Sequence, residues 1–162
     1  MKKLFFVALM CMMVLSMNAQ YVDLGLPSGT KWKTSNEQGF YNYEEAAYYY
    51  GNNLPKDWQF QELLDYCEWV WTGKGYKIVG LNGTFIILPA DGCFGGSIQR
   101  NGQWIIDSEN MYCKGVQGYY QCYTPEWQSG EWASYLYFDV SSKMVDMNNS
   151  SPRRSIRLVQ NP

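Results

Sequence analysis

The chain has 162 residues, with 13 lysines and arginines against 15 aspartates and glutamates, and it contains no histidine. Without histidine there is no Ser-His-Asp or Cys-His nucleophile, no histidine general base and no histidine-ligated zinc or haem. The net charge of −2, with lysine and arginine scattered along the chain, argues against a nucleic-acid partner.

The first 19 residues have the three regions of a secretory signal peptide. Two lysines open the segment, residues 4–15 form an apolar run, and Ala19 is the small residue before the expected cleavage site. This run is shorter than the roughly 20 residues that cross a bilayer, and no second run of spanning length follows. We therefore expect an exported protein, located in the periplasm, at the cell surface or outside the cell. Its mature part is expected to be one domain over residues 20–162, without a membrane span.

Four cysteines remain after the signal segment, and their even number permits two disulfides with three connectivities in an oxidising compartment. Their spacings include no Cys-x-x-Cys pair, so we expect no metal site and no cofactor. Cys113 and Cys122 fall in one loop-rich region, and we predict that they form a disulfide. Cys67 lies on the apolar side of a predicted helix, where a buried free thiol is the alternative.

The mature chain opens with short extended segments and a short helix. Strands are predicted at residues 21–25 and 30–32, because a Pro-Ser-Gly turn signal separates them. Asn42 is followed three residues later by Glu45, which is typical of a capped helix start, and Gly51 is expected to end this helix.

A second, amphipathic helix is predicted between Pro55 and Cys67, because apolar residues recur there at i, i+3, i+4 and i+7. The pattern then changes to strands at residues 69–71, 76–79 and 84–88, and the continuous apolar run in the last one predicts a strand covered on both faces.

The rest of the chain is less regular. Residues 89–134 are rich in glycine, and we expect a long, ordered loop region with short strands. Three final strands are predicted at residues 135–139, 144–147 and 155–159. Early helices with strands before and after them predict the α+β class.

The opening of the mature chain resembles a known family. Residues 21–32 read Tyr-Val-Asp-Leu-Gly-Leu-Pro-Ser-Gly-Thr-Lys-Trp, which is similar to the YVDLGLPSGTLW signature of exported proteins in Bacteroides-type gut bacteria. Further similar blocks lie at residues 54–71, 75–83, 87–92, 118–120, 135–138 and 157–159. The chain thus resembles the Fibrobacter succinogenes major paralogous domain family over residues 21–159.

This resemblance implies a C-type-lectin-like fold with two short helices, small antiparallel sheets and a long loop region. It also implies an exported protein, in a family that includes surface and fimbria-associated members. The chain lacks the Glu-Pro-Asn, Gln-Pro-Asp and Trp-Asn-Asp triplets of calcium-dependent sugar-binding lectins. Calcium-mediated glycan binding is therefore not expected.

Aromatic residues indicate a recognition surface. The chain has 14 tyrosines and 7 tryptophans, which is more wide, polar-tipped rings than one domain of this size can bury completely. We predict that the rings of the glycine-rich half, with two arginines, form a surface that binds a protein or glycan ligand. The predicted residues are Trp104, Tyr119, Tyr120, Tyr123, Trp127, Trp132, Arg153 and Arg154. The alternative is that about half of these rings pack in the core. Trp69, Trp71, Phe85 and Phe138 are assigned to the core.

Three functions are compatible with these patterns. The first is a non-catalytic binding module at the bacterial surface. The second is a structural or accessory subunit of a fimbrial or envelope assembly, which should expose an unpaired edge strand or a flat apolar face. A polysaccharide hydrolase is a distant third, because it needs a defined carboxylate pair and the spacing of acidic residues singles out none.

Arg157, between two apolar residues, is expected to pair with a carboxylate such as Asp23.

Overall fold

A computed structural model describes residues 20–124 and 131–162 and has a mixed α+β fold. The described strands form three small three-stranded sheets and one two-stranded ribbon, and every pairing within them is antiparallel. Two short α-helices lie between the second and third strands. The predicted α+β class, with two short helices and small antiparallel sheets, is therefore confirmed.

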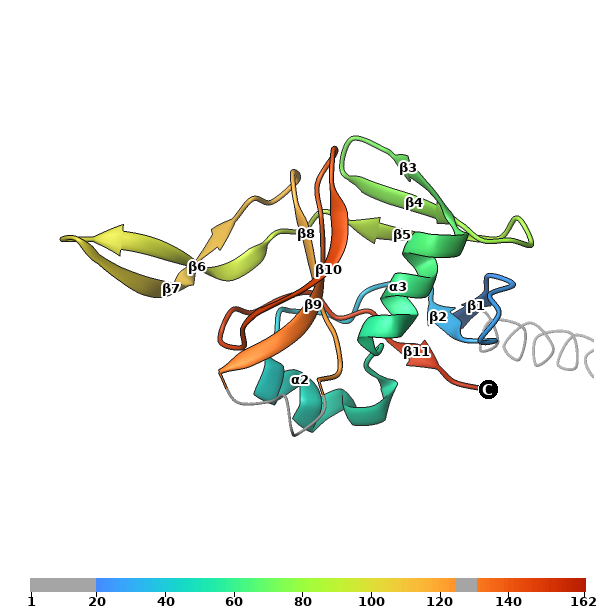
Figure 1. The fold of residues 1–162 in the computed structure, drawn as a ribbon, viewed down its shortest axis with the longest axis horizontal. Coiled ribbons are helices and arrows are strands. Elements are labelled where there is room, and N and C mark those ends of the chain that lie inside the picture. Colours follow the sequence, from blue (N-terminus) through green and yellow to red (C-terminus); the bar gives the residue numbers. More distant parts are fainter. Residues whose placement is uncertain (1–19, 125–130) are drawn as a thin grey trace, which may run out of the picture.

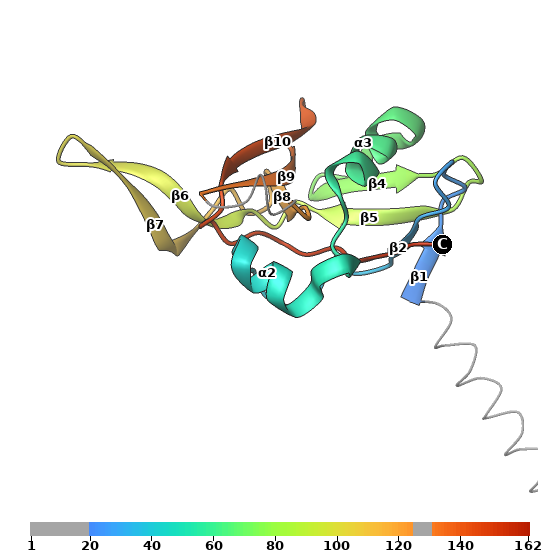
Figure 2. The same ribbon diagram turned by 60° about the horizontal axis from the view of Figure 1, so that its bottom comes forward.

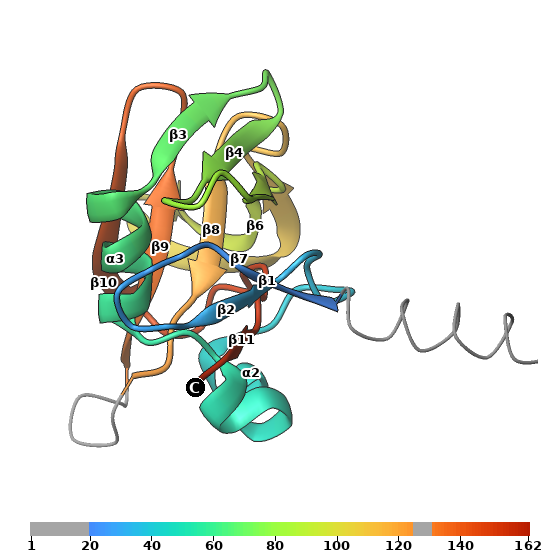
Figure 3. The ribbon, with the colours of Figure 1, turned by 90° about the vertical axis from the view of Figure 1, so that its right-hand side faces the viewer.

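The first sheet joins the two ends of the described domain. It has the order β1 (Tyr21–Asp23), β2 (Lys31–Lys33) and β11 (Val159–Gln160), so the last strand pairs with the second (Figure 3). Trp32 on β2 is fully buried, and its ring lies 5.1 Å from that of Phe60 between centroids. The sheet is thereby anchored to the helix that carries Phe60.

Helix α2 (Tyr43–Tyr50) begins where the local signal predicts. The Asn42 side chain accepts a hydrogen bond from the Glu45 amide at 2.9 Å, and the Glu45 carboxylate accepts one from the Asn42 amide at 3.1 Å. Gly51, with φ of 45°, follows the last residue and opens the short 3₁₀ turn η2 (Gly51–Asn53). This helix lies on a different side of the molecule from α3 (Figure 2).

Helix α3 (Asp57–Tyr66) is the amphipathic helix that the spacing predicts. It buries Phe60 and Leu63 on its inner side and packs beside the two strands β9 and β10 (Figure 3). Its opposite side, which carries acidic and amide residues, faces outward.

The second sheet has the order β3 (Glu68–Trp71), β4 (Gly75–Val79) and β5 (Phe85–Pro89), in agreement with the three predicted strands. Only one of its faces is covered. Phe85 is 48% exposed and Ile87 is 45% exposed, because alternation turns both outward, while Ile86 and Leu88 point into the core. The prediction that this strand is covered on both faces is wrong, and so is the assignment of Phe85 to the core.

A long two-stranded ribbon occupies much of the region expected to be loop. Strands β6 (Cys93–Arg100) and β7 (Gln103–Tyr112) are antiparallel, with a shift of register between Phe94 and Gly96, and the ribbon projects from the body (Figures 1 and 2). Asn101 and Gly102 join them with φ of 53° and 77°, the signs that a two-residue type I′ turn requires. The expected loop with short strands is thus corrected to a long hairpin over residues 93–112.

The third sheet has the order β10 (Lys143–Asn149), β9 (Trp132–Phe138) and β8 (Gly118–Gln121). Strands β9 and β10 lie where the sequence predicts strands. The predicted strand at 155–159 is wrong in part, because only its last residue belongs to β11. The segment before it instead forms isolated bridges, in which Arg153 pairs with Phe94, Arg154 with Tyr41 and Ser155 with Tyr120.

The apolar core contains two clusters of buried side chains. The larger includes Phe60, Tyr120, Leu136 and Phe138, and the partly buried Trp69 and Trp71 pack against it. Phe138 is fully buried, as predicted. The smaller cluster comprises Ala46, Leu54, Ile156 and Leu158. Across the described ranges, no helix has both the length and the apolar character needed to cross a membrane.

Arg157 is buried, but its partners are not those expected. Its guanidinium donates to Asn36 Oδ1 at 2.9 Å, to the Lys33 carbonyl at 2.7 Å and to the Ile87 carbonyl at 2.5 Å. The carboxylate of Asp23 accepts the Gly25 amide instead. The predicted pairing with Asp23 is therefore wrong, and Arg157 connects the segment after β2 to strand β5.

Candidate functional site

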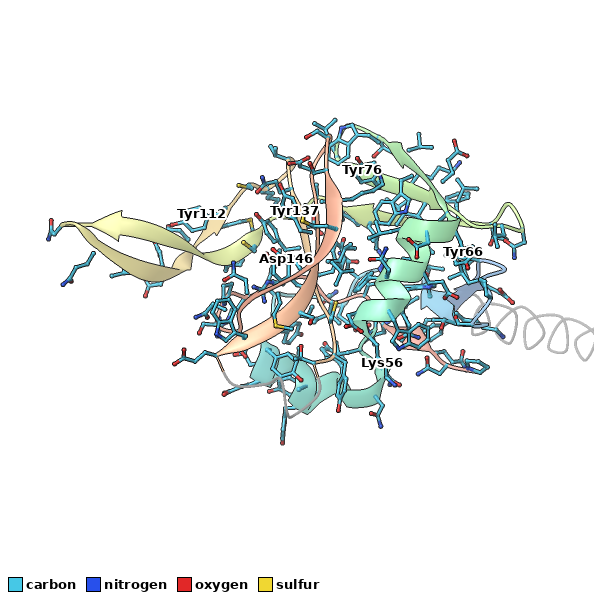
Figure 4. The ribbon with its side chains drawn as sticks, viewed as in Figure 1. Lys56, Tyr66, Tyr76, Tyr112, Tyr137 and Asp146 are labelled. Atoms are coloured by element: carbon cyan, nitrogen blue, oxygen red, sulfur yellow. The ribbon has the colours of Figure 1, made fainter. Side chains whose placement is uncertain are left out.

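Three tyrosines occupy the outer face of the third sheet. Alternation along β9 places Tyr135 and Tyr137 on the face opposite Leu136 and Phe138, where Tyr135 is buried and Tyr137 half-buried, and Tyr119 lies opposite Tyr137 on β8. The Tyr119 ring centroid is 6.1 Å from that of Tyr135, nearly parallel, and 5.3 Å from that of Tyr137. Figure 4 labels Tyr137 on β9 and Asp146 on the neighbouring strand β10, where Asp146 lies opposite Tyr135.

A pocket of about 150 Å³ lies against this tyrosine face. The base of the ribbon forms one wall, because Gly92 bridges to Gly118 of β8, and the ribbon leaves the body beside that strand (Figure 1). The segment that precedes β11 forms another wall. We call this the Arg154 pocket, and it is lined by Cys93, Gly95, Tyr119, Tyr135, Asn148, Asn149, Pro152 and Arg154.

Arg154 is the charged residue of this pocket, and it is only 3% exposed. Its guanidinium donates to Gln121 Oε1 at 3.2 Å and to the Asn149 carbonyl at 2.9 Å, and it lies 4.2 Å from the centroid of the Tyr135 ring. All these partners are neutral, and Arg154 forms no ion pair with any residue that the structure describes. Burial lowers the pKa of Arg154, but an arginine in a protein remains protonated. The pocket therefore contains a buried positive charge without a carboxylate beside it.

The other titratable groups of the pocket are neutral at physiological pH. Burial raises the pKa of the Cys93 thiol to about 11 and raises the pKa of the Tyr119 and Tyr135 phenols. The Tyr135 hydroxyl donates to Asp146 Oδ2 at 3.0 Å, so the Asp146 carboxylate lies beyond the far end of that phenol and is exposed.

This arrangement favours binding over covalent or acid–base chemistry. The Cys93 thiol is protonated at neutral pH and is a poor nucleophile in that form. No carboxylate lines the pocket that could serve as a general base. What the pocket offers is a desolvated cation with hydrogen-bond donors around it, which can hold a ligand in a fixed orientation.

The structure brings two of the predicted ligand-binding residues together. Tyr119 and Arg154 line the same pocket. Arg153 lies next to it with an exposed side chain that pairs with Glu45 at 3.0 Å. Trp132 is 54% exposed, but strand alternation places its side chain on the opposite face of β9 from Tyr135.

The remaining predicted residues do not contribute to this pocket. Tyr120 is fully buried, because β8 turns it toward the core, and its hydroxyl donates to the Pro89 carbonyl at 2.8 Å. Tyr123 is half-buried and packs against the smaller core cluster. Trp127 lies outside the described residues, and Trp104 lies on β7 with its side chain outside the described part. The prediction of an exposed ligand surface is therefore corrected for Tyr120 and for Arg154, both of which are buried.

The predicted disulfide is also absent from the structure, in which Cys113 and Cys122 are free thiols. Cys122 is fully buried in the larger core cluster, whereas Cys113 is exposed in the turn after β7. The pairing of Cys113 with Cys122 is therefore wrong, because these side chains lie in different environments of the fold.

A second concave surface was not predicted. A groove of about 470 Å³ runs between α3 and β10, and Trp58 and Tyr66 are its exposed aromatic residues. Figure 4 shows Lys56 and Tyr66 at the two ends of this helix. The groove is lined by Asp57, Trp58, Gln61, Glu62, Asp65, Tyr66 and Val145. Most of these side chains are exposed and already solvated, so the groove lacks the buried charge that distinguishes the Arg154 pocket.

In the comparisons with known proteins, the chain matches no family model, no curated protein and no solved structure.

Proposed function

We propose that the chain is an exported, non-catalytic binding module of C-type-lectin-like architecture that holds a protein or glycan ligand at the bacterial surface, in the Arg154 pocket. The observation that carries this proposal is the buried guanidinium of Arg154, which lines the pocket and has only neutral partners. A buried charge is costly to desolvate unless it is paired, and a bound ligand can supply the pairing that the described residues do not.

The clustering of shifted pKa values supports the same location. Cys93, Tyr119, Tyr135 and Arg154 all depart from their ordinary pKa values because they are desolvated, and all four line one pocket. Groups of this kind gather at functional sites more often than elsewhere. The long ribbon between β5 and β8 also occupies the region where the family resemblance implies extended loops.

A binding array of glycans and gut-associated proteins, probed with mature chain 20–162, tests this proposal. The wild-type protein should bind at least one ligand class, and Arg154→Met should lose that binding while its circular dichroism spectrum stays unchanged. Arg153→Met is the matched control, because Arg153 is exposed and does not line the pocket. A wild-type protein that binds nothing on either array contradicts the proposal, as does equal binding by both variants.

A second candidate function is supported by a different surface. The outer side of the β3–β4–β5 sheet exposes Val70, Phe85 and Ile87, and β5 is an edge strand of that sheet. Lys77 lies between Val70 and Ile87 on this face, with its ammonium 4.3 Å from the Phe85 ring centroid. A face that is largely apolar in this way is expected of a structural subunit in an envelope or fimbrial assembly. Sedimentation velocity distinguishes the two functions: a subunit should self-associate with rising concentration, and Phe85→Lys should abolish the association.

A further inference from the structure

We infer that the Arg154 pocket recognises the carboxylate of an acidic sugar residue, of the uronic acid type. This inference rests on the proposed function, because it names the ligand class of the same pocket. It follows from the charge, the hydrogen-bond donors and the size of the pocket.

The charge favours an anion. Arg154 is nearly fully buried, and its hydrogen bonds go to a side-chain amide and a main-chain carbonyl. A guanidinium carries five N–H donors, so these two bonds leave further donors for a planar acceptor. A carboxylate matches that geometry and can accept two parallel bonds from it. The Asp146 carboxylate accepts a hydrogen bond from the Tyr135 hydroxyl and is exposed to solvent. Solvent and salt screen its charge, so it repels a bound carboxylate only weakly.

The rim of the pocket also supplies donors. The Asn148 side-chain oxygen accepts the Asn149 amide at 2.7 Å, and the Asn149 side-chain oxygen accepts the Ser151 amide at 2.8 Å. One lone pair of each amide oxygen is thus engaged with the backbone, and the N–H groups of the Asn149 side chain can donate to a ligand. A ligand that brings acceptors, as a carboxylate does, can use these donors.

The shape and chemistry of the pocket favour a sugar over a peptide terminus. A volume of about 150 Å³ is smaller than the roughly 300 Å³ of the smallest ordinary ligand pockets, so it suits one terminal group rather than an extended chain. Sugar hydroxyls can exchange hydrogen bonds with the asparagine amides at the rim, as donors or as acceptors. The half-buried Tyr119 ring adds an apolar surface against which a sugar ring can pack.

Titration with glucuronate, followed by NMR at the Arg154 Nε–Hε resonance, tests this inference, with glucose as the neutral control. Glucuronate should shift the resonance in a saturable way, and glucose should bind at least tenfold more weakly. Asn148→Asp adds a negative charge at the exposed rim and should weaken glucuronate binding at least tenfold. Asn53→Asp is the control, since it makes the same charge change at an exposed residue outside the pocket.

Three results would overturn the inference: no shift with glucuronate, equal binding of glucose and glucuronate, or wild-type affinity in Asn148→Asp. A short peptide that binds through its C-terminal carboxylate, with no competition from glucuronate, would also overturn it. If the binding of an array ligand is changed neither by Asn148→Asp nor by excess glucuronate, this inference fails while the proposed binding function stands. If the arrays yield no ligand, the proposed function fails on that result alone.

Discussion

Replacing Arg157 by methionine should destabilise the fold strongly, because this residue connects segments that are distant in sequence. Its guanidinium bonds to Asn36, to the Lys33 carbonyl and to the Ile87 carbonyl, and only 1% of the residue is exposed. Methionine fills much of the volume but donates no hydrogen bond. The two carbonyls then lose a charged donor in a part of the protein that water reaches poorly.

The size of the effect can be worked out from these contacts. A hydrogen bond to a charged group contributes about 1.5–3 kcal/mol, and such values do not add fully within one network. Burial lowers the pKa of Arg157, which shows that desolvation of its charge offsets part of the gain. A buried acceptor that is left without its donor costs about 1–3 kcal/mol, and three acceptors lose a donor in Arg157→Met, so we expect a total loss of about 3–5 kcal/mol. That is a large share of the roughly 5–15 kcal/mol that stabilises an ordinary domain.

Urea unfolding of mature chain 20–162, followed by tryptophan fluorescence, measures this loss as a lower midpoint at an unchanged m-value. Arg153→Met is the matched control, because this arginine is half-exposed and makes one surface ion pair with Glu45. Its effect should stay within about 1 kcal/mol. If the two variants unfold at the same urea concentration, the reasoning about Arg157 is refuted.

Two further predictions concern other parts of the fold. Gly118→Ala should lower the melting temperature clearly in a calorimetric scan, because the added Cβ would lie 2.1 Å from Phe138 Cζ; a wild-type melting temperature would contradict the tight packing at this site. Hydrogen bonds from the Tyr137 hydroxyl and from the Ser141 and Ser142 amides lower the pKa of Asp139 to about 2. The folded pKa lies below the unfolded value of about 3.9, so Asp139 stabilises the fold above pH 4, and this contribution is lost as the pH falls toward 2. Asp139→Asn should therefore reduce the change in stability between pH 4 and pH 2 in urea titrations, and an unchanged pH profile would count against these bonds.

Local signals predicted the elements whose causes are local. The capping box of Asn42 and Glu45 depends on residues three positions apart, and α3 depends on a helical repeat within ten residues. The ribbon was missed although its own signal was present, since Asn101 and Gly102 form the dipeptide most typical of a two-residue hairpin turn. The many glycines of residues 89–134 favour a loop, and a single dipeptide does not reveal how far the two flanking strands extend.

The candidate site was predictable only in part, because adjacent residues meet opposite environments. Tyr119 lines the Arg154 pocket while Tyr120 is buried in the core, and the alternation of β8 separates them. The pattern of aromatic residues alone does not predict which of two adjacent residues on a strand faces the core and which faces away from it. Arg154 reaches the pocket through isolated bridges rather than a regular strand, and its partner Gln121 lies 33 residues away in the chain. Such a contact is fixed by the tertiary fold and leaves no periodic signal in the sequence.

Two glycines explain why the pocket exists at all. Gly92 and Gly118 form the bridge that sets the base of the ribbon against β8. A Cβ on Gly92 would lie 2.1 Å from the Tyr112 carbonyl oxygen, and φ of 73° there is a conformation that other residues rarely adopt. A larger residue at Gly92 would displace the backbone at Tyr112 and Lys114, at the base of the ribbon, where Tyr112 pairs with Cys93 in the wall of the pocket. A larger residue at Gly118 would instead meet the Phe138 ring in the core. The wall that helps to bury Arg154 therefore depends on the close backbone contact at Gly92, which only glycine permits.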